Sequence, residues 1–409
     1  METPDTSDLA LAHGFVDPAL AERLTDNPLD DGDALDEAVA HPWTEGLHAA
    51  IARWTYFARE RDENYDFYRD TLPKVRAWAL DRHPERPLAL LRAGTDDRVT
   101  LSQRHARHLL ACAFFLGTLD TVSAGSLSLT SLYVSTSPSA VERIVCLLAY
   151  FHAADDASDA PTLTYTRHRL DRARAPRWTE RDVPIGAARV TLHTGRMEDT
   201  DAEVFFDFAN RDLHIHSIIP SLTQEEVLFS ACPELFPALL VCERMADDEV
   251  IVLEGARRFC EYSGYLRSFR FEGLRDDRRA QEVLAADAVF HDHFSPESVL
   301  RDLDKVWLGF TACRGRSVST GHWGCGAFGG NRVAKFLQQC CAAAESDTAL
   351  AYSTFGDEDT AAALRDLLAT LAARGATVGA VTRALCGYDG DDDDASVAQH
   401  VLAQTRVKA

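Results

Sequence analysis

The chain has 409 residues, of which 46% are hydrophobic and 26% are charged, a composition typical of a globular protein with about two to three domains. Its formal net charge of -22 excludes nonspecific binding to nucleic acid or to an anionic membrane, because such binding relies on lysine and arginine side chains that displace counterions. We therefore expect neither nucleic acid nor a membrane among its partners.

The cysteines and the N-terminus indicate the compartment. The ten cysteines include no CxxC pair, so the spacing indicates neither a zinc site nor a disulfide framework. The N-terminal stretch "METPDTSDLALAHGF" lacks the basic region and apolar core of a signal peptide, and no run reaches the ~20 apolar residues of a membrane span. We expect a reduced, intracellular, soluble protein that carries no cofactor.

The first part of the chain is predicted to be helical. Residues 1–40 are acidic and rich in turn formers, and the stretch "TLSQRHARHLLACAFFLGTL" at 100–119 repeats apolar residues at intervals of three and four. This spacing predicts a helix with one face in the core, with Thr100 or Ser102 as its N-cap.

From about residue 160 the pattern changes to short segments rich in branched and aromatic residues, which predict strands. These segments are "TLTYTR" (162–167), "ARVTLHTG" (188–195), "EVFFDFA" (203–209), "EVIVLEG" (249–255) and "ALAYSTFGD" (349–357). Helical patterns at 331–346 and 359–376 alternate with them. The order predicts a mainly helical accessory domain at 1–135, an α/β domain at 136–385 and an acidic C-terminal tail at 386–409.

Two stretches carry the candidate chemistry. Residues 207–226, "DFANRDLHIHSIIPSLTQEE", bring two adjacent glutamates together with an Asp, an Asn and two His, although neighbouring carboxyls raise each other's pKa. The second stretch, "TGHWGCGAFGGN" at 320–331, is a glycine-rich loop before a predicted helix. Such a loop suits a diphosphate, because backbone N–H groups and the helix dipole both favour an anion.

Together these stretches resemble the poly(ADP-ribose) glycohydrolase family. The resemblance runs in order through "RVTLSQRHARHLLACAFF", "LTYTR", "DFAN", "QEEVLFSACPEL", "FCEYSGY", "ADAVFHDHFSPESVLRDLDKVWLGF", "TGHWGCGAFGGN" and "YSTFGD". It implies a helical accessory domain joined to a macrodomain-like mixed sheet between helical layers. It also implies binding of ADP-ribose and cleavage of the ribose-ribose bond of poly(ADP-ribose).

The resemblance assigns roles to individual positions. Glu226 matches the family's catalytic acid, Glu225 would hold ribose hydroxyls, and Asp207 lies beside them in the catalytic set. A proton donor of this kind contributes ~10² to 10⁴ in rate. The residues expected to bind ligand are Asn210, Gln224, Tyr265, Gly324, Gly326, Ala327, Phe328 and Phe355, together with His214, His216 and His322.

The sequence departs from the family at four positions, which lie in two places. His214, Ile215 and His216 stand where the family has three glycines, and His322 stands where it more often has Asn. If the three positions require left-handed backbone, non-glycine residues there cost ~1 to 2 kcal/mol each, so we expect a rebuilt loop. An extended HIH would place both imidazoles on one side, where they could bind a metal. Alternatively they contact phosphate or ribose, or they cap a loop that no longer serves catalysis.

These features predict a glycosidase that acts on poly(ADP-ribose) or on ADP-ribosylated protein, with Glu226 as general acid and base. Two alternatives stay open. One is a pseudoenzyme that binds ADP-ribose without cleaving it, and the other is a glycohydrolase for a different ADP-ribosyl linkage. The paired Glu225 and Glu226 favour an enzyme, and the loss of the glycines favours the alternatives.

Overall fold

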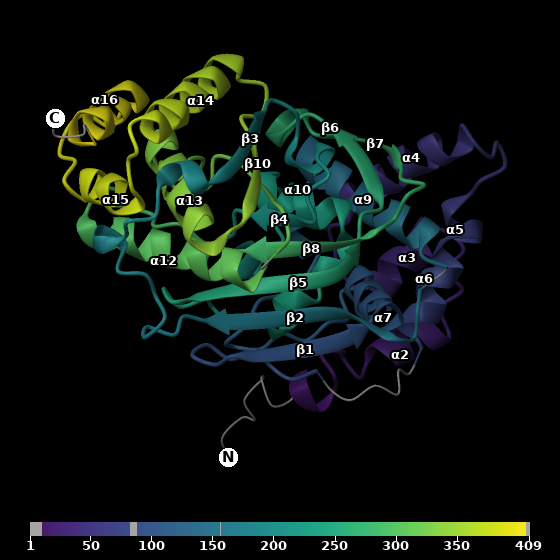
Figure 1. Ribbon diagram of the computed structural model, residues 1–409. Coiled ribbons are helices and arrows are strands. Elements are labelled where there is room, and N and C mark those ends of the chain that lie inside the picture. The colour runs from purple at the N-terminus through teal and green to yellow at the C-terminus, as the bar shows by residue number, and fades with distance from the viewer. Residues whose placement is uncertain (1–9, 82–87, 156, 314, 406–409) are drawn as a thin grey trace.

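A mixed sheet of eight strands runs through the middle of the computed structural model, which describes residues 10–81, 88–155, 157–313 and 315–405. Helices cover both faces of this sheet (Figure 1). From one edge to the other, the strands are β1 (Asp97–Ser102), β2 (Pro161–Arg169), β5 (Glu249–Arg257), β8 (Ala280–Ala285), β4 (Val204–Asp207), β9 (Val318–Thr320), β10 (Ala349–Ser353) and β3 (Arg189–His193). The predicted mixed sheet between helical layers is confirmed.

The sheet divides into an antiparallel half and a parallel half. β1, β2, β5 and β8 pair antiparallel, and β8, β4, β9, β10 and β3 pair parallel. Parallel strands have both faces covered and therefore read as apolar runs, as the fully buried "VFFD" of β4 does. Their carboxyl ends meet at one edge of the sheet, and the residues that follow β4, β9 and β10 gather there.

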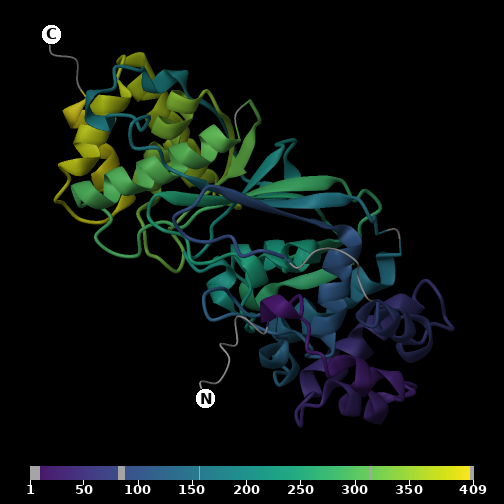
Figure 2. The ribbon, with the colours of Figure 1, turned by 90° about the horizontal axis from the view of Figure 1, so that it is seen from below.

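The helices of the N-terminal part pack with one face of the sheet in a single apolar core. The predicted helix within 100–119 is confirmed as α7 (Gln103–Phe114), and the Ser102 hydroxyl caps it by accepting the His105 N–H at 3.0 Å. The other helices of this part are α2 (Leu20–Thr25), α3 (Gly32–Val39), α4 (Glu45–Arg59), α5 (Phe67–Asp70), α6 (Leu72–Ala79), α8 (Thr130–Tyr133) and α9 (Pro138–Ala153). Figure 2 shows them at the opposite end of the molecule from the C-terminal helices.

A second core covers the other face of the sheet. Its helices are α12 (Pro296–Ala312), α13 (Arg332–Ser346), α14 (Glu358–Ala373), α15 (Val378–Cys386) and α16 (Asp394–Gln404). α13 and α14 confirm the helices predicted at 331–346 and 359–376. The segment predicted as an acidic tail contains α16, whose Val397 and Val401 are buried in this core. The predicted boundaries at 135 and 386 stay predictions.

All five predicted strands are present, as β2, β3, β4, β5 and β10. Sequence patterns missed β1, β8 and β9, and also the hairpin formed by β6 (Cys260–Ser263) and β7 (Arg270–Leu274). The expectation that strands begin only after residue 160 is wrong, because β1 extends the sheet from the N-terminal part. In the part of the chain that the structure describes, no helix is both long and apolar enough to span a membrane.

Candidate active site

The predicted catalytic residues lie where β4 ends and α10 (Gln224–Ala231) begins. Asp207 is the last residue of β4, and the QEE sequence forms the first turn of α10. The Gln224 side chain ties the two elements together, since its Oε1 accepts the Phe208 N–H at 2.8 Å and its Nε2 donates to the Phe206 carbonyl at 3.1 Å. Although Gln224 was predicted as a ligand contact, both ends of its amide are engaged by backbone.

Glu226 forms a capping box at the start of α10. The backbone N–H of Thr223 donates to Glu226 Oε2 at 2.7 Å, and the Thr223 hydroxyl donates to the same oxygen. The Ser221 hydroxyl also reaches it, at 3.5 Å. A Thr followed three residues later by Glu is a recognised signal for a helix start, so Glu226 has a structural role besides any catalytic one.

The surroundings of Glu226 favour its charged form. Burial, the largest influence, opposes ionisation of this carboxyl. The hydrogen bonds from Thr223 and the guanidinium of Arg143 act against burial, and the pKa of Glu226 is lowered from its ordinary value. Its position in the first turn of a helix acts in the same direction. In the unliganded protein Glu226 is therefore a carboxylate at neutral pH.

The two neighbouring carboxyls have the opposite tendency. Burial, then Asp207 and Glu226, raise the pKa of Glu225 well above its ordinary value, although Glu225 Oε1 accepts the His214 N–H at 2.5 Å. Burial and the charge of Glu226 also raise the pKa of Asp207, and neither of its carboxyl oxygens has a hydrogen-bond partner among the described residues. The surroundings thus favour the charged form of Glu226 and the neutral forms of Glu225 and Asp207.

Glu225 and Glu226 face a cleft made of two adjoining cavities, with volumes of about 360 Å³ and about 300 Å³, whereas Asp207 is fully buried and lines neither cavity. The first cavity contains the carboxyl end of the site, with Glu225, Glu226 and Asn210 in its wall. The second lies toward the aromatic residues Tyr262, Tyr265 and Phe355. Both cavities are lined by Phe208, Gln224, Tyr265, His322 and Gly326. A ligand with two ends could occupy both.

The glycine-rich loop forms the wall opposite Glu226, and Gly324, Gly326, Ala327 and Phe328 line the first cavity. The loop closes on itself because the Gly330 N–H donates to the Gly324 carbonyl at 2.9 Å. A Cβ atom at Gly330 would lie 2.8 Å from that carbonyl oxygen and 2.9 Å from Lys335 Cε. Only glycine fits there, so the loop can lie directly over the lysine side chain.

Lys335 lies buried beneath this loop, in the first turn of α13. Its ammonium group pairs with buried Asp302 and lies 5.2 Å from the centroid of the Trp323 ring. A cation at this position reinforces the positive potential at the start of α13. The loop therefore lies over a buried lysine that is paired with Asp302 at the start of α13.

Tyr265 and Phe355 come from distant segments and meet at one end of the cleft. Tyr265 follows β6 and Phe355 follows β10, yet their ring centroids are 5.6 Å apart in an edge arrangement. Both rings are unusually open to solvent, with exposed fractions of 37% and 54%. Exposed aromatic faces of this kind suit a planar ligand.

The three residues that replace the family's glycines keep left-handed backbone. The φ angles of His214, Ile215 and His216 are 54°, 51° and 54°. The strain considered from the sequence is therefore present, and the expected rebuilding of the loop stays a prediction. Left-handed backbone costs ~1 to 2 kcal/mol at each non-glycine residue, so contacts elsewhere must offset this strain.

The structure separates His214 and His216 from the other predicted site residues. The His214 ring is fully buried between Phe229 and Phe236, with centroid distances of 5.1 and 5.6 Å. His216 Nδ1 lies 3.5 Å from a carboxyl oxygen of Asp212. Neither residue lines the cleft. Consecutive residues in a helical backbone point in different directions, and of these three Ile215 is the one in the cleft wall.

The metal interpretation of this loop assumed an extended backbone with both imidazoles on one side, and the backbone is not extended. Within the described ranges, no group of three His, Cys, Asp or Glu side chains is placed to hold a metal ion. His322, in contrast, lies in the cleft wall as predicted, with Nδ1 3.1 Å from the Tyr352 hydroxyl.

Comparison with known families agrees with this geometry. The family described as "Poly (ADP-ribose) glycohydrolase (PARG), Macro domain fold" matches residues 175–362, and its helical domain matches residues 59–169. The chain belongs to the poly(ADP-ribose) glycohydrolase family. The predicted resemblance is thereby confirmed.

Curated relatives lie in the same family. The chain is 33% identical to poly(ADP-ribose) glycohydrolase 1 of Arabidopsis thaliana over 246 residues, which are 55% of this chain and 45% of the relative. It is 25% identical to poly(ADP-ribose) glycohydrolase 1 of Caenorhabditis elegans over 335 residues, 75% of this chain and 42% of the relative. The chain thus spans less than half the length of these two relatives.

Solved structures of the family are more distant. The Thermomonospora curvata glycohydrolase bound to the inhibitor ADP-HPD has 16% identity and a TM-score of 0.33, covering 44% of this chain and 80% of that one. The Deinococcus radiodurans glycohydrolase in complex with ADP-ribose has 15% identity and a TM-score of 0.34, covering 45% and 86%. Likenesses this weak add nothing to the family assignment.

The sequence patterns missed several residues that line the cleft. Most are apolar and carry no local signal, because apolar side chains in core and cleft look alike in a sequence. They are Phe208, Ile215, Ile219, Phe290 and Trp323. Thr223 could have been found, since the capping-box pattern Thr-x-x-Glu is visible in "TQEE".

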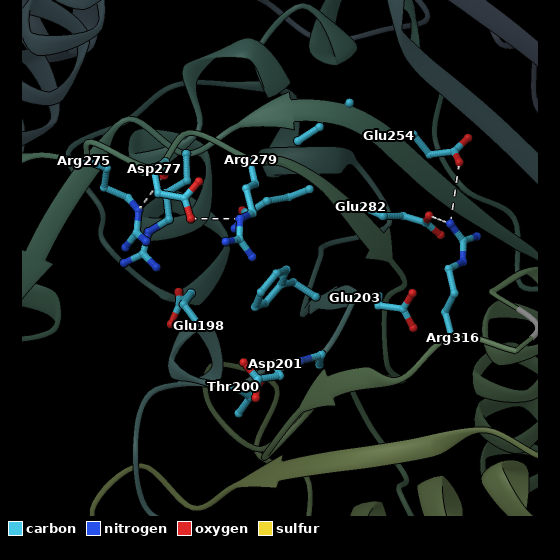
Figure 3. Close-up of a pocket in the computed structure, with 16 residues that line it drawn as sticks. Glu198, Thr200, Asp201, Glu203, Glu254, Arg275, Asp277, Arg279, Glu282 and Arg316 are labelled. Carbon is cyan, nitrogen blue, oxygen red and sulfur yellow. Dashed lines mark hydrogen bonds and ion pairs between the residues drawn. The ribbon is translucent and has the colours of Figure 1, made fainter.

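A separate hollow of about 650 Å³ lies beside the opposite ends of β4 and β8 (Figure 3). Its walls are charged with both signs, and several of these charges pair with one another. Arg316 pairs with Glu282, and Arg279 Nε lies 2.9 Å from a carboxyl oxygen of Asp277. Of the residues predicted for the active site, none lines this hollow.

Proposed function

We propose that this family member hydrolyses the ribose-ribose O-glycosidic bond of poly(ADP-ribose) and releases ADP-ribose. One observation carries the proposal: Glu225 and Glu226 stand in the wall of a cleft, opposite a glycine-rich loop and next to an exposed aromatic pair. Each part of that cleft suits a different part of ADP-ribose.

The ligand would lie along both cavities. Backbone N–H groups of the loop at Gly324 to Phe328, at the start of α13, would hold the diphosphate. Tyr265 and Phe355 would pack on the adenine, whose flat ring suits their exposed faces. The distal ribose would then lie beside Glu225, Glu226 and Asn210, with its anomeric carbon near the carboxyls.

Cleavage needs one proton on the leaving oxygen. In the proposed reaction the Glu226 carboxyl donates this proton to the glycosidic oxygen, and the bond from that oxygen to the anomeric carbon breaks. Water then attacks the cationic anomeric carbon and returns one proton to Glu226. The negative charges and dipoles of the site stabilise the cation, and the proton donor contributes ~10² to 10⁴ in rate.

The proton must first reach Glu226, because the pKa of this carboxyl is lowered in the unliganded protein. The pKa values of its neighbours Glu225 and Asp207 are raised, which favours their protonated forms. A ribose that takes over the Thr223 hydroxyl would remove a hydrogen bond that favours the carboxylate. Substrate binding would then shift Glu226 toward its acid form.

A second candidate is an ADP-ribose-binding protein without hydrolytic activity. Two observations favour it: Glu226 is already used as a helix cap, and the glycines of the loop are absent. A glycohydrolase for another ADP-ribosyl linkage is also compatible with the rebuilt cleft wall at Ile215.

One assay distinguishes these functions. Incubate the protein with poly(ADP-ribose) and, separately, with mono-ADP-ribosylated protein, and quantify free ADP-ribose. We expect Glu226→Gln to abolish release while ADP-ribose still raises the melting temperature, since Gln also satisfies a capping box. Glu297→Gln, in the first turn of α12 and outside the cleft, is the matched control. Wild-type turnover by Glu226→Gln would refute the assignment of the acid.

A further inference from the structure

The loop from His214 to Ser221 connects β4 with α10 and carries strained backbone into the active site. A loop in this conformation needs fixed contacts, since otherwise it would relax toward ordinary φ angles. Its own sequence supplies no glycine at the three left-handed positions. The stabilising contacts come from another part of the molecule.

Arg143 supplies three of these contacts from α9, in the helical part of the protein. The side chain is almost fully buried. One terminal nitrogen donates to His214 Nε2 at 2.8 Å. The other donates to the carbonyls of Ile219 at 2.6 Å and Ser221 at 3.2 Å. A single guanidinium therefore holds both ends of the loop, because its N–H donors lie in one rigid plane and point in different directions.

His214 transmits this contact to the catalytic residues. Because its Nε2 accepts from Arg143, its Nδ1 carries the hydrogen and donates to the Ser217 carbonyl at 2.8 Å. The ring is neutral, as burial and then the charge of Arg143 lower its pKa to about 4. The backbone N–H of the same residue donates to Glu225 at 2.5 Å. The direction of that N–H depends on the left-handed φ.

We propose that Arg143 is a positioning residue of the active site, which clamps the loop of residues 214–221, with its left-handed backbone at 214–216, and thereby fixes Glu225 and Glu226. The inference rests on the proposed function for its catalytic consequence. It makes the helical part of the chain a component of the active site rather than only a neighbouring domain.

Arg143 also acts through its charge. Within the described residues it hydrogen bonds to neutral acceptors, two carbonyls and one imidazole, so its charge is available to the carboxyls behind the loop. The groups that face Glu226 are Asp207 from β4, Glu225 from α10, His214 from the loop, Arg143 from α9 and the hydroxyl of Tyr265. Loss of the guanidinium removes a charge that lowers the pKa of Glu226.

Two substitutions separate the clamp from the charge. Arg143→Gln removes both, and Arg143→Lys keeps the charge but cannot reach both ends of the loop. Arg257→Gln is the control for losing a buried guanidinium elsewhere, because Arg257 pairs with buried Glu234 away from the cleft. The readouts are hydrogen exchange of residues 212–223 and the pH profile of kcat/KM.

We expect exchange in residues 212–223 to rise about tenfold in both Arg143 variants and to stay at the wild-type rate in Arg257→Gln. The limb of the pH profile that reports protonated Glu226 should move to higher pH in Arg143→Gln and stay in place in Arg143→Lys. If Arg143→Gln fails to fold, Arg143→Lys still tests the clamp.

Wild-type protection of residues 212–223 in the Arg143 variants, or equal opening in Arg257→Gln, would overturn the proposal. A wild-type protein that releases no ADP-ribose would instead refute the proposed function. In that case the exchange measurement still decides whether Arg143 holds the loop.

Discussion

Replacing Ile215 by glycine tests the left-handed loop directly. Ile215 has φ 51° and ψ 26°, a region in which a β-branched residue is a clear outlier. Its side chain is 40% exposed, so it contributes little to the core. Among the three left-handed residues it is the one at which strain can be relieved without removing a buried hydrogen bond.

The magnitude follows from comparing Gly with Ala at this position. Left-handed backbone costs a non-glycine residue ~1 to 2 kcal/mol, whereas the greater freedom of unfolded Gly costs ~0.5 to 1 kcal/mol. Both substitutions remove nearly all of the Ile side chain. We therefore expect Ile215→Gly to be more stable than Ile215→Ala by about 0.5 to 1 kcal/mol.

Urea unfolding of the two variants measures this difference. Ile219 provides the matched control, because it lines the same cavity and is absent from the residues with positive φ. At Ile219 we expect the reverse order, with Ala more stable than Gly. If Ala is also the more stable residue at position 215, the left-handed assignment of the loop is refuted.

Three further predictions concern the loop and the glycine-rich wall. Lys335→Met should weaken ADP-ribose binding about tenfold, which would appear as a smaller ligand-induced rise in melting temperature. Lys305→Met is the control, because it removes an equally buried ion pair, and it should keep the full rise. His214→Ala should lower the free energy of unfolding by ~1 to 3 kcal/mol, because buried Arg143 loses its hydrogen bond to the imidazole. His216→Ala should lower it by less than ~0.5 kcal/mol. Equal losses for the two variants in urea unfolding would contradict the burial of His214 and the more open position of His216. The pKa of His214 is lowered from 6.5 to about 4, so the unfolded chain takes up the proton first as pH falls. The neutral imidazole therefore contributes stability on the order of 3 kcal/mol, which is present above pH ~6.5 and is lost between pH ~6.5 and ~4. If a His214→Asn variant loses unfolding free energy with falling pH as steeply as the wild type does, His214 is not the source of this pH dependence.

The sequence by itself determined the family and the fold class, and it singled out Glu225 and Glu226 as the proposed catalytic pair. These features depend on short-range patterns: five strands were recognisable from branched and aromatic runs, and α7 from its apolar spacing and Ser102. β8 was missed because its sequence, "AQEVLA", has the composition of a helix, and β9 was missed because its sequence, "VST", is too short to show a strand pattern. Their strand conformation comes from neighbours on both sides in the sheet.

The tertiary structure alone decided how the departures from the family act. Residue types at 214–216 predicted strain, but only packing shows that His214 turns into the core and Ile215 into the cleft. Arg143 lies 71 residues before His214 in the chain, so no local pattern links them. The pKa values of the three carboxyls depend on the same long-range contacts, because burial and through-space charge are properties of the folded arrangement and not of neighbouring residues in the sequence.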